Sequence, residues 1–162
     1  MFNGIDIEEL NGDIETLKED PSLCQINEKL TAEWVGGFRA RIYSEDKELY
    51  IGGEDDFSAM SLTQASLLAC EIDVIVLYAT LRGIELEKLT IEGLGEFNLS
   101  RFLNIADNPS PGFQKIKYKV KIKARNVSPE QLKDFAALCE NVSPVGDSLS
   151  RAVPITLEFE VE

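Results

Sequence analysis

The stretch SLTQASLLACEIDVIVLYATLRG, residues 61–83, decides the fold of this chain. Ser61 is a good helix N-cap with Gln64 three residues later, as in a capping box. Gly83 suits the left-handed position that follows the end of a helix. Between these signals apolar residues occupy every side of the helix. A helix that is apolar all round is typical of the centre of a protein, so the stretch predicts a long, buried central helix.

The same stretch is long and apolar enough to suggest a membrane span. Polar residues interrupt it at Gln64, Glu71 and Asp73, and a carboxylate at the centre of a bilayer is costly. A core helix is therefore the better interpretation, and we expect no membrane association.

Patterns on either side of this helix predict the remaining elements. Residues 5–19 have apolar residues at helical spacing, which predicts a helix inside an N-terminal appendage of residues 1–25. Alternating apolar residues predict strands at 38–43, 49–51, 87–97, 115–125 and 155–161. Helix-start signals lie at Ser128-Pro129 and at Ser143-Pro144. This order predicts an α+β fold in which a mostly antiparallel sheet packs on helices, in a single domain of residues 1–162.

The strand predicted at 115–125 carries six cations on one face: Lys115, Lys117, Lys119, Lys121, Lys123 and Arg125. This face is either an anion site or simply solvated, and the second interpretation is favoured because charged faces are usually solvated. Glutamates alternate in the strands near residue 92 and at 158–162. Opposite charges on neighbouring strands stabilise a sheet. We therefore predict that the lysine strand lies beside at least one acidic strand.

Composition excludes several function classes. The net charge of −13 disfavours nucleic acids and anionic membranes, which are themselves negatively charged. The chain contains no histidine, so catalysis by Ser-His-Asp or Cys-His arrangements is excluded. Three widely spaced cysteines and an acidic N-terminus predict a reducing cytoplasm, no metal site and no cofactor.

Cys70, Cys139 and Cys24 are the candidate nucleophiles. Cys70 lies in the middle of the central helix, where a free cysteine often packs as a small apolar residue. Cys139 is a second thiol near the end of the helix that begins at Ser128, and packing is again the favoured interpretation. Cys24 follows Pro21 in a segment that is expected to be exposed. Reactivity at Cys70 requires a nearby positive charge and some exposure.

Several motifs resemble the OsmC/Ohr family of small hydroperoxide-handling proteins. The run SLLAC at 66–70 resembles the reactive-cysteine helix of that family. The runs PGFQKI at 111–116, SPEQL at 128–132 and SPV at 143–145 follow in the family's order. The runs NGID at 3–6, EDP at 19–21 and WVGG at 34–37 resemble one subgroup that has an N-terminal helix.

The resemblance implies an intertwined homodimer whose curved sheets enclose two central helices. It also implies thiol-dependent reduction of organic hydroperoxides, in which one cysteine attacks and a second forms a disulfide with it. Cys70 matches the attacking cysteine, and Arg41 is the best match for an arginine that tunes it, with Arg39 as the alternative. Ser143 stands where the second cysteine is expected. The family's glutamate near the start of the central helix is missing, because residues 58–61 read SAMS.

Two functions remain open on the sequence. The chain is either a peroxidase that uses Cys70, Arg41 and an external thiol reductant, or a non-catalytic dimer that binds an apolar small molecule between its subunits. Cys70 and Arg41 favour the first function. The missing glutamate and the missing second cysteine favour the second.

Overall fold

The computed structural model describes residues 1–151, 153–158 and 160, and their arrangement is α+β. The helices are α1 (Ile7–Glu19), the 3-10 turn η1 (Pro21–Cys24), α2 (Ala59–Leu81), α3 (Pro129–Glu140) and α4 (Pro144–Ser150). The strands are β1 (Thr31–Gly36), β2 (Arg39–Tyr43), β3 (Glu48–Ile51), β4 (Glu85–Phe97) and β5 (Phe113–Arg125). All strand pairs are antiparallel.

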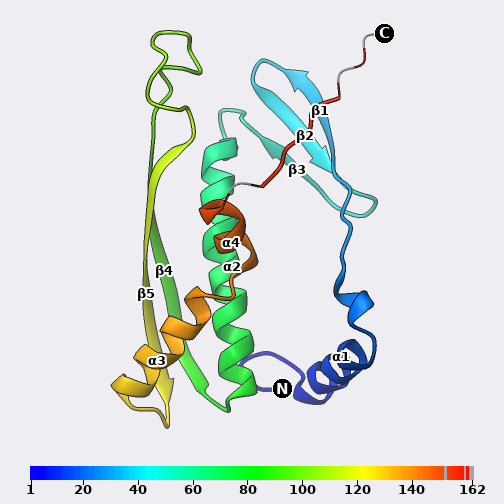
Figure 1. The fold of residues 1–162 in the computed structure, drawn as a ribbon, viewed down its shortest axis with the longest axis vertical. Helices are drawn as coiled ribbons and strands as arrows, with labels where there is room; N and C mark the ends of the chain where they lie inside the picture. The colour runs from blue at the N-terminus through cyan, green and yellow to red at the C-terminus, as the bar shows by residue number, and fades with distance from the viewer. Residues whose placement is uncertain (152, 159, 161–162) are drawn as a thin grey trace.

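The central helix α2 organises the molecule (Figure 1). It begins one turn before the predicted N-cap, because Ser58 is extended and accepts a hydrogen bond from the backbone N–H of Ser61. The prediction of Ser61 as N-cap was therefore wrong, and Gln64 instead lies against Gly93 and Gly95 on β4. Gly83 has a φ of +66°, which confirms the predicted left-handed position after the helix.

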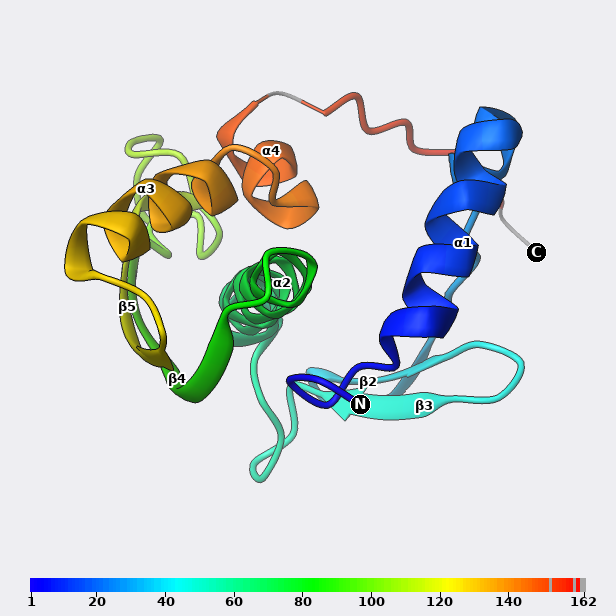
Figure 2. The same cartoon turned by 90° about the horizontal axis from the view of Figure 1, so that it is seen from below.

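The long hairpin of β4 and β5 lies along one side of α2. Its inward residues contact the buried core: Leu86, Leu89, Ile91, Val120 and Ile122 pack against a cluster of Val74, Ile75, Ala79, Phe135 and Cys139. Helices α3 and α4 close this side of α2, as seen from below in Figure 2. The core therefore lies between α2, α3 and the hairpin.

The outer face of the hairpin confirms the prediction for the lysine strand. Register places Lys119 opposite Glu92 and Lys115 opposite Glu96. Lys121 pairs with Glu92, and Arg125 contacts Glu85 at 2.9 Å and Glu87 at 2.7 Å. The cations are therefore compensated by the neighbouring strand, as expected for a solvated face.

The strands form two sheets instead of the one curved sheet expected. The sheet β1-β2-β3 is separate from the hairpin β4-β5. The predicted hairpin is present in it as β2 and β3, and β1 was missed because residues 31–36 lack a clear alternation. Figure 2 shows α1 and this sheet on the opposite side of α2 from β4, β5 and α3.

Two further expectations need correction. The central helix is not buried on all sides within one chain: Ala65, Ala69 and Ile72 are exposed, and the buried side includes Leu67, Glu71 and Val74. The predicted strand at 155–161 is absent from residues 153–158 and 160, which have no regular secondary structure, because no neighbouring strand pairs with them. Residues 159 and 161 lie outside the described part of the chain.

Helix α2 is long and apolar enough to cross a membrane by length and composition alone. One side of it packs against β4, α3 and α4, with the acidic Glu71 on the buried side, and 22% of its most apolar stretch is buried within one chain. The choice of a core helix over a membrane span stays a prediction.

Candidate functional site

Cys70 and Ser143 meet at the contact between α2 and α4. The Cys70 sulfur lies 3.4 Å from the Ser143 hydroxyl oxygen, and either atom can donate the hydrogen bond. Ser143 is the N-cap of α4, where its oxygen accepts from the backbone N–H of Gly146 at 3.1 Å. The Ser143 side chain is buried, whereas Cys70 is half-buried. With its oxygen occupied by Gly146, the hydroxyl proton of Ser143 is free to point at the sulfur.

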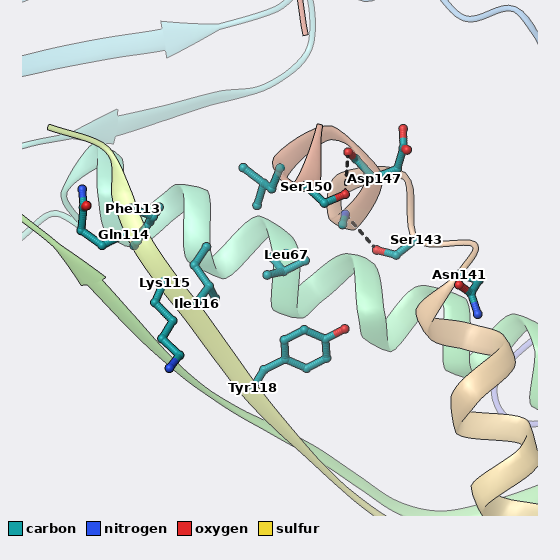
Figure 3. A pocket seen from close by; sticks show the side chains of 12 residues that line it. Leu67, Phe113, Gln114, Lys115, Ile116, Tyr118, Asn141, Ser143, Asp147 and Ser150 are labelled. Carbon is teal, nitrogen blue, oxygen red and sulfur yellow. Dashed lines mark hydrogen bonds between the residues drawn. The ribbon is translucent and has the colours of Figure 1, made fainter. Parts of the chain in front are cut away.

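A cavity of about 560 Å³ lies beside Ser143, whereas Cys70 is not among the residues that line it (Figure 3). Its wall combines residues of α2, β5 and the α3–α4 region, with Leu67, Phe113, Ile116 and Tyr118 forming much of the apolar part. Polar side chains line it on both walls, from Gln114 and Lys115 of β5 and from Asn141, Ser143, Asp147 and Ser150. Small-molecule sites usually combine apolar walls with a few polar groups.

Glu71 is a buried acidic group of this region. Its side chain is 2% exposed, and its Oε1 atom has no hydrogen-bond partner within the described residues. A Cβ atom built on Gly146 would lie 3.0 Å from the Ser143 hydroxyl oxygen and 3.5 Å from Glu71 Oε1. The carboxyl group and the hydroxyl group thus face the same point at the start of α4.

The other two cysteines differ from Cys70 in their surroundings. Cys139 is 2% exposed and belongs to the core cluster, the packed position that the sequence favoured. Burial raises the pKa of the Cys139 thiol; the charge of Arg82 opposes this effect, and Glu71 adds to it. Cys24 is exposed on η1. Cys70 is therefore the thiol whose hydrogen-bonding partner, Ser143, lines a cavity.

The two candidate arginines lie on β2, away from Cys70 within one chain. Arg41 contacts Glu48 at 2.7 Å and Glu33 at 3.4 Å. Arg39 contacts Asp56 at 2.7 Å and stacks over the ring of Tyr50. Hydrogen bonding to these carboxylates raises the pKa of both guanidinium groups, so each is a fixed positive charge.

The sequence pointed to Cys70 and Arg41, gave Ser143 only as the residue in place of the expected second cysteine, and did not point to Glu71. Glu71 stands out in the sequence only as a polar interruption of an apolar helix. The one available signal was an acidic residue directly after the candidate cysteine. Among the described residues, no group of three or more Cys, Asp or Glu side chains is placed to hold a metal ion.

Comparison with known proteins gives a consistent family. The model of the OsmC-like protein family matches residues 52–158. An OsmC-like protein from Mycoplasma pneumoniae has a similar structure, with a TM-score of 0.66 and 19% sequence identity over 78% of this chain and 89% of that one.

Two proteins with hydroperoxide resistance in their names have the same fold. For the organic hydroperoxide resistance protein OsmC of Legionella pneumophila the TM-score is 0.54 at 18% identity, over 77% of this chain and 91% of that chain. For OhrB of Bacillus subtilis it is 0.50 at 19% identity, over 76% of this chain and 90% of that chain. No curated protein matches the sequence. The family model covers most of the chain, including α2, Cys70 and Ser143, and this protein belongs to the OsmC-like family.

Proposed function

We propose that this protein reduces organic hydroperoxides through Cys70 and is regenerated by an external thiol. The observation that carries the proposal is the half-buried Cys70 sulfur, 3.4 Å from the hydroxyl of Ser143, which itself lines a cavity. The names of the two hydroperoxide resistance proteins with this fold support the same chemistry.

The reaction needs one cysteine in the protein. The Cys70 thiolate attacks the terminal oxygen of R–O–OH, forming an S–O bond and breaking the O–O bond, and R–OH leaves after gaining a proton. A small thiol then condenses with the Cys70 sulfenic acid to a mixed disulfide and water. A second small thiol releases Cys70 as a thiol and forms the free disulfide. Ser143 cannot form a disulfide, which is why an external thiol, as supplied by a reducing cytoplasm, is required.

We further propose that the active form is a homodimer in which the partner's β1-β2-β3 sheet covers α2. Within one chain Arg41 has no contact with Cys70 among the described residues, whereas α2 exposes the apolar side chain of Ile72 and no residue of the sheet is buried. A second copy placed on the exposed side of α2 would bring an arginine of β2 towards Cys70. Arg41 is the favoured arginine for this role, and Arg39 is the alternative.

A second function is favoured by the replacement of the expected second cysteine by Ser143. The cavity is large enough for a small apolar molecule, and the buried Ser143 lies on its wall. A dimer that binds such a molecule without chemistry would need the cavity and not the Cys70 thiol.

Consumption of cumene hydroperoxide in the presence of dithiothreitol separates the two functions. We expect turnover by the wild-type protein and its loss in Cys70→Ser, because serine is a far weaker nucleophile. The matched control is Cys24→Ser, which removes an exposed thiol remote from the cavity and should turn over at the wild-type rate.

Equal activity in wild type and Cys70→Ser would show that Cys70 does not react, and the binding function would then be preferred. Loss of activity in Cys24→Ser alone would place the reactive thiol outside the cavity.

A further inference from the structure

The buried carboxyl group of Glu71 has no structural role within the described chain. Its side chain is 2% exposed, and Oε1 lacks any hydrogen-bond partner among the described residues. A buried polar atom without a partner costs roughly 1–3 kcal/mol of stability. Such groups are rare in native proteins and call for an explanation, for which a catalytic role is one candidate.

The Ser143 hydroxyl contacts Cys70 and comes close to Glu71, although it is not hydrogen-bonded to Glu71 Oε1 in this structure. Glu71 Oε1 and the Ser143 hydroxyl oxygen border the same point beside Gly146. The hydroxyl oxygen in turn lies 3.4 Å from the Cys70 sulfur. Because Gly146 has no side chain, nothing from α4 fills the space between the carboxyl and the hydroxyl group.

No ion pair accounts for this carboxyl group. Among the described residues Glu71 has no salt bridge, whereas Glu85, Glu87 and Glu92 are all paired with cations on the surface. Glu71 and Arg82 both act electrostatically on the thiol of Cys139. Arg82 lies over the rings of Tyr78 and Phe135.

We propose that Glu71 is the proton carrier for the reaction of Cys70 and that Ser143 conducts the proton between them. This inference rests on the proposed peroxidase function. Glu71 acts through Ser143 and does not itself touch the peroxide.

The proton that the leaving alkoxide needs comes from a group in the site, and it is replaced when the Cys70 thiol is regenerated. During attack the proton resides on Glu71, and the Cys70 thiolate forms a bond to the terminal oxygen of R–O–OH. The O–O bond breaks and its electron pair stays on the oxygen of R–O⁻. Ser143 gives its hydroxyl proton to R–O⁻ and takes the proton of Glu71 in its place. The Cys70 thiol that the external reductant later regenerates returns a proton to Glu71 by the reverse route.

The leaving group distinguishes this role from a structural one. An alkyl hydroperoxide releases an alkoxide, which needs a proton, whereas a peracid releases a stable carboxylate, which does not. The rate of Cys70 oxidation by cumene hydroperoxide divided by its rate with peracetic acid therefore reports proton delivery. The fraction of Cys70 present as thiolate affects both rates equally and cancels in this ratio.

We expect Glu71→Gln to lower this ratio by about 100-fold or more, the usual range for the loss of a general acid. Ser143→Ala interrupts the same path at its other end and should lower the ratio similarly, which covers the case in which Glu71→Gln does not fold. Glu71→Asp keeps a carboxyl group and should recover part of the ratio. Single-turnover stopped-flow measurements on the reduced full-length protein provide both rates.

An unchanged ratio in Glu71→Gln, with Cys70 still oxidised by both reagents, would overturn the proton-carrier role and leave the peroxidase function intact. A wild-type protein whose Cys70 is oxidised by neither reagent would overturn the peroxidase function and this inference together.

Discussion

Ser143 has two roles at once, and they involve different atoms. Its oxygen accepts the backbone N–H of Gly146 and so caps α4, while its hydroxyl hydrogen can serve the Cys70 sulfur. Ser128 has only the capping role, since its oxygen accepts the N–H of Gln131 at 3.2 Å at the start of α3. The chain thus contains a pair of serine caps that differ in their contact with Cys70.

Ser143→Ala and Ser128→Ala should each lower the free energy of unfolding by about 1 kcal/mol, since each removes a helix cap. Only Ser143→Ala should also slow the labelling of Cys70 by iodoacetamide at neutral pH, because a hydroxyl donor stabilises the thiolate that reacts. Urea denaturation gives the stabilities, and peptide mass spectrometry gives labelling at Cys70 separately from Cys24. Equal labelling rates in the two variants would contradict a hydrogen bond from Ser143 to the sulfur.

At the scale of residues, sequence reasoning succeeded where the signal is local. The Ser128 cap follows from the order Ser-Pro-Glu-Gln, and the structure shows both of its hydrogen bonds. The start of α2 was misplaced because Ser58 and Ser61 are both good caps and only the backbone distinguishes them. Glu71 was missed because its role depends on how α4 packs over α2, which no local pattern encodes.

The β4–β5 hairpin is stabilised on its outer face by charge pairs, most densely around Glu87. Hydrogen bonding by Lys123 and then by Arg125 holds the pKa of Glu87 below its usual range. A carboxyl group with a lowered pKa in the folded state stabilises the protein above the pKa of the unfolded chain. That contribution is lost as the pH falls through the lower, folded-state pKa.

Glu87→Gln should therefore be less stable than the wild type at pH 7, and the difference should disappear at an acidic pH at which Glu87 is protonated in both the folded and the unfolded state. The difference should be small and should shrink in high salt, because the pair is at the surface. Urea midpoints at both pH values test this. The control is Glu96→Gln on the same strand, because Glu96 forms no salt bridge among the described residues. An equal loss of stability in Glu96→Gln would mean that the net charge of the strand matters and that the pairing of Glu87 with Lys123 and Arg125 does not.

At the scale of elements, periodicity predicted the strands and helices that bury one face within the chain. The alternation at 115–125 gave β5 and its acidic neighbour because one face packs on α2 and the other is solvated. The expectations that failed involve surfaces that the single chain does not cover. The apolar stretch at 61–83 predicts burial on all sides, and the alternation at 155–158 predicts a strand, yet Ile155 and Leu157 are 94% and 82% exposed.

In the whole molecule, one side of α2 is left exposed to solvent. Within residues 31–51, all of which the structure describes, no residue of the sheet β1-β2-β3 is buried. A small sheet without a covered apolar face is marginal in water. On α2, Ala65, Ala69 and Ile72 form an exposed stripe at helical spacing. The proposed dimer would cover both surfaces at once, and it would account for a sequence of α2 that is apolar on every side.

Trp34, the single tryptophan, reports on this assembly because its side chain is 78% exposed on β1 within one chain. We expect a dimeric mass by light scattering, with tryptophan emission at the short wavelengths of a buried indole. Ile72→Arg places a charge on the apolar stripe and should weaken the dimer by about 100-fold or more, a cost of roughly 3 kcal/mol. Its monomer should show red-shifted emission.

Leu94→Arg is the matched control, since Leu94 is 61% exposed on the charged outer face of the hairpin and should leave the mass unchanged. A monomeric wild type with exposed Trp34 would mean that Arg41 never reaches Cys70, and the chemistry would then rest on Cys70, Ser143 and Glu71 alone.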